Sequence, residues 1–105
     1  MKFFQVLTTN KFTSTLDRQY TTVNNFASLA EAMRIFNFYE NKDAQDGVEY
    51  IEKFSGRKTV QFHLHYEENG GAVLELRHEY FGIPEGCTTE QVVGMEAVYL
   101  KEIDL

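Results

Sequence analysis

The sequence has few of the residues that stabilise small secreted proteins. Its 105 residues include one cysteine, one proline and no tryptophan. The single cysteine, Cys87, cannot form an internal disulfide, whereas small secreted domains usually carry several. We therefore expect a reducing compartment, namely the cytoplasm. No internal repeat or low-complexity linker divides the chain, so we predict a single domain over residues 1–105.

Long apolar runs are also missing. The longest span only a few residues, far below the roughly 20 that a membrane-spanning helix requires, so no membrane association is predicted. The apolar start, Met1–Leu7, is cut short by the polar residues 8–11, and no small-residue cleavage site follows. This pattern is typical of a first strand rather than of a signal peptide.

The motifs of common active sites are absent from the sequence. The glycines match neither the Gly-x-Gly-x-x-Gly pattern nor the Gly-Lys-Ser/Thr ending of phosphate-binding loops. No Gly-x-Ser-x-Gly nucleophile elbow is present, and no Cys-x-x-Cys accompanies Cys87. We therefore expect a protein that is not an enzyme and that has no cofactor and no metal.

Positive charge is scarce in the second half of the chain. The net charge is −6, with 16 acidic and 10 basic residues. Residues 1–47 hold five acids and five bases, whereas residues 48–105 hold eleven acids and five bases. Such a charge disfavours direct binding to nucleic acids or to anionic membranes, and it favours a partner protein with a basic surface.

The N-terminal half predicts strands followed by a helix. Residues 2–8 and 12–23 look extended, which indicates an N-terminal strand or a hairpin turning near Asn10 and Lys11. Ser28 and Glu31 have the spacing of a capping box, which satisfies backbone N–H groups where a helix begins. Apolar residues then recur at helical spacing, so we predict a helix over about residues 28–41.

A three-stranded antiparallel meander is predicted within residues 48–81. Its strands cover 48–54, 60–66 and 73–80, with turns at 55–57 and 69–71. If one face of the last two strands is apolar, a three-residue loop at 69–71 pairs Leu64 with Leu76 and Tyr66 with Leu74. His78 would then point away from the face that carries His63, His65 and Glu75.

The C-terminal residues predict a second helix. Thr88 and Gln91 form another capping box, and Cys87 and Val92 occupy the two positions of a hydrophobic staple. We predict a helix over about residues 88–101, with a last strand over 97–103 as the alternative. The expected fold class is therefore α+β, an antiparallel sheet with one face packed by the two helices.

The histidines and carboxylates of the meander are the candidate functional residues. We interpret His63 and His65 as solvated side chains, and a small-ligand or metal site of His63, His65 and Glu75 is the alternative. The predicted partner-binding surface collects acidic, histidine and aromatic side chains on the outer face and at its edge. Its members are Glu67, Glu68, Glu75, Glu79, His63, His65, Tyr66, Tyr80 and Phe81.

These observations predict a non-enzymatic, acidic protein-interaction module. The most concrete hypothesis is a small inhibitor or immunity-type protein, of the kind that phages and bacteria carry, which blocks the basic surface of a nucleic-acid-handling enzyme. The alternatives are the ligand-binding or metal-binding protein described above and a structural subunit that forms homo-oligomers.

Overall fold

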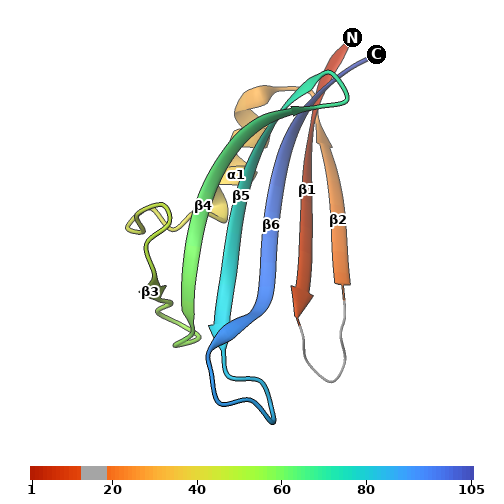
Figure 1. Ribbon diagram of the computed structural model, residues 1–105. Coiled ribbons are helices and arrows are strands. Elements are labelled where there is room, and N and C mark those ends of the chain that lie inside the picture. The colour runs from red at the N-terminus through yellow and green to blue at the C-terminus, as the bar shows by residue number, and fades with distance from the viewer. Residues whose placement is uncertain (13–18) are drawn as a thin grey trace.

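The protein is built around one antiparallel sheet with a helix on one face. The structure is a computed structural model and describes residues 1–12 and 19–105. Within these residues the strands are in the order β2-β1-β6-β5-β4-β3 (Figure 1). The elements are β1 (Lys2–Phe12), β2 (Gln19–Phe26), α1 (Leu29–Phe38), β3 (Tyr50–Ile51), β4 (Lys58–Glu68), β5 (Gly71–Gly82) and β6 (Gln91–Asp104).

The predicted α+β class with two packing helices is wrong. The described chain is mostly antiparallel sheet with a single short helix, and the helix predicted over 88–101 is strand β6. The alternative of a last strand is the correct one, although that strand begins earlier, at Gln91. None of the described helices has the length and apolar character needed to cross a membrane.

Strand β6 was mistaken for a helix because it lies in the middle of the sheet. It pairs along its length with β1 and β5. Ala97 and Val98 point to opposite faces and both are fully buried. Since apolar residues occupy both faces of this strand, they follow one another without alternation, and their spacing fits a helix as well as a strand. The glycine at position 94 and the β-branched Val92 and Val93 favour the strand.

The N-terminal hairpin is confirmed, but its predicted turn is wrong. β1 and β2 pair antiparallel. Asn10 and Lys11, where we predicted the turn, lie within β1 and pair with Tyr20 and Gln19. Residues 13–18, between the two strands, are outside the described part of the chain.

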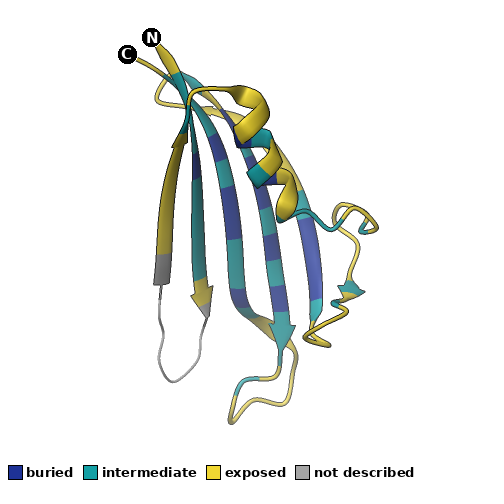
Figure 2. Ribbon diagram, turned by 180° about the vertical axis from the view of Figure 1, so that it is seen from behind, coloured by how far each residue is buried: buried dark blue, intermediate teal, exposed yellow. Residues whose placement is uncertain are grey.

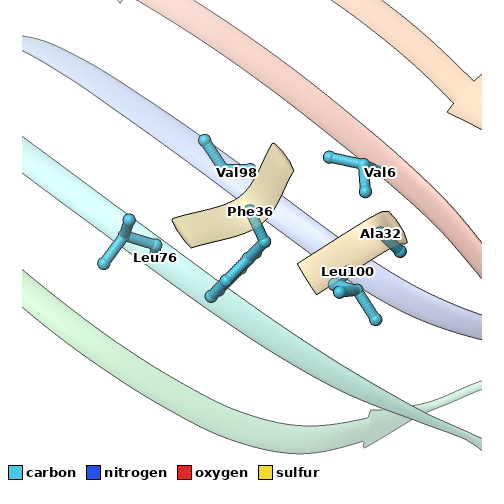
Figure 3. Packing of buried hydrophobic residues seen from close by; sticks show 6 residues of the cluster. All are labelled: Val6, Ala32, Phe36, Leu76, Val98 and Leu100. Atoms are coloured by element: carbon cyan, nitrogen blue, oxygen red, sulfur yellow. The ribbon is translucent and has the colours of Figure 1, made fainter. Parts of the chain in front are cut away.

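The predicted first helix is confirmed as α1. The backbone N–H of Glu31 donates to the Oγ of Ser28 at 3.1 Å, as expected of an N-cap. Ala32 and Phe36 are the buried residues of α1. They pack against strand residues of the same hydrophobic cluster, namely Val6, Leu76, Val98 and Leu100 (Figure 3). This packing of α1 on β1, β5 and β6 forms the core.

The register of the β4–β5 hairpin differs by one residue from the predicted one. Asn69 and Gly70 have φ values of 54° and 80° and form a two-residue connection, because Glu68 pairs with Gly71. Leu64 consequently pairs with Glu75, and His63 pairs with Leu76. A shift of one residue moves every side chain of β4 to the other face relative to β5. The predicted register is wrong because it assumes that only one face of β4 and β5 is apolar.

The first predicted strand of the meander is much shorter than expected. Only Tyr50 and Ile51 of residues 48–54 form β3, which pairs with Thr59 and Lys58 at the edge of the sheet. The predicted turn at 55–57 is confirmed, since the N–H of Gly56 donates to the carbonyl of Glu52 at 2.8 Å.

The two-residue turn gives a first testable prediction. Gly70→Val should lower the free energy of unfolding by about 1–2 kcal/mol, because a β-branched side chain is strained at positive φ. Asn69→Gly should change it by less than about 0.5 kcal/mol, since glycine adopts the same conformation without strain. Urea denaturation of both variants measures the difference. Equal losses would show that the turn does not have this conformation.

Candidate functional site

The strand pairings divide the sheet side chains between two faces. The helix face carries the even-numbered residues of β1 and β5, those of β6 from position 94 onward, and the odd-numbered residues of β4. We call the opposite side the open face, because no described element covers it (Figure 2 shows α1 on the other side).

The predicted partner-binding residues are split between these faces. Glu68, Glu75, Glu79, Tyr66 and Phe81 belong to the open face. The other predicted residues belong to the helix face, and they are Glu67, His63, His65 and Tyr80. The structure therefore does not bring them together on one surface.

Glu75 is not an exposed acid. Its side chain is only 2% exposed. The hydroxyl of Tyr66 donates to its Oε1 at 2.9 Å, and Nε of Arg77 donates to its Oε2 at 2.8 Å. Burial and the neighbouring Glu75 carboxylate raise the pKa of Tyr66. The negative charge of Glu75 is thus compensated within the chain.

Two further charges of the open face are also paired. Nζ of Lys101 donates to Oε2 of Glu68 at 3.0 Å and lies 5.9 Å from the centre of the Tyr99 ring. Nζ of Lys58 lies 2.7 Å from Glu90 and 3.0 Å from Glu49. Most charged side chains of this face are therefore paired with a neighbouring side chain of opposite charge.

Apolar and aromatic side chains occupy much of the open face. Leu64 and Tyr66 are 36% and 37% exposed, and Val23 is 50% exposed. Val60, Val73 and Ala97 are buried among larger neighbours. The other apolar members, all partly exposed, are Phe3, Leu7, Phe62, Phe81, Met95, Tyr99 and Ile103.

The three residues of the alternative metal site do not converge. His63 and His65 are on the helix face, whereas Glu75 is on the open face. His63 instead contacts Asp46 through Nδ1 and Glu40 through Nε2, the latter at 3.4 Å. Partial burial raises the pKa of Asp46, but the hydrogen bonds from His63 outweigh this effect and hold the pKa below its usual range. Within residues 1–12 and 19–105, no three His, Cys, Asp or Glu side chains are placed to share a metal ion.

A row of polar side chains crosses the helix face, and the sequence did not reveal it. Asn10, Glu96, His78 and Gln61 are directly opposite one another on β1, β6, β5 and β4. We refer to these four residues as the polar row. The prediction that His78 lies on the face opposite His63 is wrong, because both residues lie on the helix face.

Gln61 fixes one end of the polar row. It is fully buried, and its Oε1 accepts from the backbone N–H of Asn41 at 2.8 Å. Its Nε2 donates to the carbonyl of Asn41 at 3.1 Å. The same Oε1 lies 2.7 Å from Nε2 of His78. Gln61 thus joins the loop after α1 to the middle of the sheet.

A hollow lies at the end of the sheet where the two termini meet. Its lining includes Lys2, Lys101, Glu68 and Glu102. These side chains pair with one another, Lys2 with Glu102 at 3.2 Å and Lys101 with Glu68 at 3.0 Å. Both lysines of the hollow are therefore already paired, and its four carboxylates outnumber them.

Comparison with protein-family models, curated proteins and solved structures found no match to this chain.

Proposed function

We propose that this protein is a non-enzymatic interaction module, and that its open face binds the open face of a second copy. The observation that carries the proposal is the apolar character of a sheet face that no described element covers. An antiparallel sheet that is covered on one side normally presents polar residues on the other. Extended apolar surface is typical of a site of association.

The balance of charge favours a second copy as the occupant. Lys11, Lys58, Arg77 and Lys101 on the open face are offset by three carboxylates of the same strands and by Glu49 and Glu90 beside Lys58, which leaves a net charge of −1. Since the whole chain carries −6, the remainder carries −5. Two open faces, each nearly neutral, would repel one another only weakly, and most of the acidic charge would remain on the outside.

The dimensions of the face are sufficient for such a contact. The five long strands are about 4.8 Å apart and about 11 residues long, so they cover about 24 by 36 Å. A stable interface needs about 800 Å² on each partner, and this face offers about as much. Sheets packed face to face would bury it, with each α1 on the outside.

The predicted inhibitor of a nucleic-acid-handling enzyme stays a separate prediction. Its basic partner would find little complementary charge on the open face, because Glu68 and Glu75 are already paired. Such a partner would have to contact the acidic remainder of the molecule instead.

The test is the solution mass of the protein and of two matched lysine variants. We expect the chain, of 12.2 kDa, to form a dimer in sedimentation equilibrium at micromolar concentration. Leu64→Lys should raise the dimer dissociation constant at least about 100-fold, because it places two like charges in one interface. Phe38→Lys should leave the dissociation constant unchanged. Phe38 is 82% exposed, but it is on α1 and not on the open face.

A monomeric wild type at about 100 μM, a concentration at which interfaces of this size associate, would contradict the proposal. So would an equal loss of association in the Phe38→Lys variant. Circular dichroism of both variants would verify that each keeps its fold.

A further inference from the structure

Two buried hydrogen-bond acceptors of the polar row have no partner in the described chain. These are Nδ1 of His78 and Oδ1 of Asn10. His78 as a whole is only 5% exposed. Buried polar atoms are nearly always hydrogen-bonded, and leaving one unpaired costs about 1–3 kcal/mol. Two such atoms in one row therefore call for an explanation.

The hydrogen bonds of Gln61 determine which nitrogen of His78 carries the proton. Oε1 of Gln61 must be the acceptor, because a backbone N–H donates to it. Nε2 of His78, 2.7 Å away, is therefore the donor. Burial, with a smaller contribution from His63, lowers the pKa of His78 and so favours the neutral ring. Nδ1 is left as a bare acceptor.

Glu96 lies between the two unpaired acceptors. It is directly opposite His78 on one side and Asn10 on the other. Opposed side chains of an antiparallel pair have Cβ atoms about 4.5–5.5 Å apart. Burial, and after it the negative charge of Glu52, raises the pKa of Glu96. The row thus places three hydrogen-bond acceptors side by side on neighbouring strands.

The position of the row leaves it outside the contact with α1. The nearest strand residues that α1 packs against are Leu76 and Val98, one step along the same face (Figure 3). On the other side of the row, Gly94 has no side chain and the ring of Tyr80 lies 6.5 Å from that of His78. An aromatic ring beside a group of acceptors suits an organic cation.

We propose that Asn10, Glu96 and His78 form a binding site for the guanidinium group of a small organic cation. A guanidinium is planar and donates hydrogen bonds in several directions at once. It can therefore donate to more than one acceptor of the row at once, since neighbouring strands are about 4.8 Å apart. A compact ammonium group would reach fewer of them. This site is on the helix face and is independent of the proposed dimer contact.

The test is a titration of the protein with methylguanidinium, followed by ¹⁵N NMR of the histidine rings. In the free protein, Nδ1 of His78 should have the chemical shift of an acceptor without a donor. Methylguanidinium should move it saturably, whereas its neutral analogue methylurea should not. Glu96→Gln should weaken binding at least about tenfold. Glu79→Gln, which removes the same charge from the open face, should not.

Three results would overturn the proposal. In the first, Nδ1 of His78 is already hydrogen-bonded in the free protein and does not respond, which means that a water molecule or a proton on Glu96 fills the site. In the second, methylurea binds as tightly as methylguanidinium, which excludes recognition of charge. In the third, methylammonium binds more tightly than methylguanidinium, which excludes the guanidinium.

Discussion

Replacing Phe36 by alanine should destabilise the protein by about 3–5 kcal/mol, the usual cost of deleting a buried phenyl ring. Phe36 is 5% exposed and joins α1 to Leu76 and Val98 (Figure 3). It is one of two buried residues in this helix, so few other contacts can compensate. Small domains have about 5–15 kcal/mol of stability in total, and the loss is therefore a large part of it.

Urea denaturation followed by circular dichroism measures the effect of Phe36→Ala. The matched control is Phe38→Ala, because Phe38 is two residues further along α1 and 82% exposed. It should cost less than about 0.5 kcal/mol. If Phe36→Ala does not fold, Phe36→Leu should still cost up to about 1.5 kcal/mol. Equal effects at positions 36 and 38 would mean that α1 does not pack with this face.

Replacing Gln61 by leucine should cost on the order of 3 kcal/mol, although leucine has a similar volume. The change leaves three groups without their partners, namely the N–H and the carbonyl of Asn41 and Nε2–H of His78. Each buried group that loses its hydrogen bond costs about 1–3 kcal/mol, and Asn41 recovers part of this from water.

A double-mutant cycle checks the origin of this loss. Gln61→Leu combined with His78→Leu should be less destabilising than the sum of the two single changes, because the double variant leaves no unpaired ring nitrogen. Amide exchange at Gly47, whose N–H donates to the carbonyl of Gln61 at 2.9 Å, should accelerate in the single variant. A Gln61→Leu protein as stable as the wild type would contradict the network described here.

Features encoded within a few residues could be predicted from the sequence. The N-cap of α1 depends on Ser28 and Glu31, which are three positions apart, and its hydrogen bond is present. The turn at 55–57 and the strands β4 and β5 are likewise local patterns. Features that depend on distant partners were not predictable in this way. β6 is a strand because β1, some 90 residues earlier, pairs with it.

The candidate surfaces depended on the hairpin register, which the sequence alone left ambiguous. An apolar residue on each face of β4 and β5 allows two registers, and the two-residue turn at Asn69 and Gly70 selects between them. That choice separated Glu75 from His63 and moved His78 into the polar row. The polar row itself spans four strands, so the residue pattern of any single strand does not identify its members.

Isotope-filtered NOE measurements on a dimer of labelled and unlabelled chains test the central claim most directly, because they identify the residues that meet across the interface. Our account predicts contacts from the methyl groups of Leu64 in one copy to open-face side chains such as Tyr66 and Met95 in the other. No contacts between copies, or contacts from Phe38 on the outer side of α1 in place of Leu64, would contradict it.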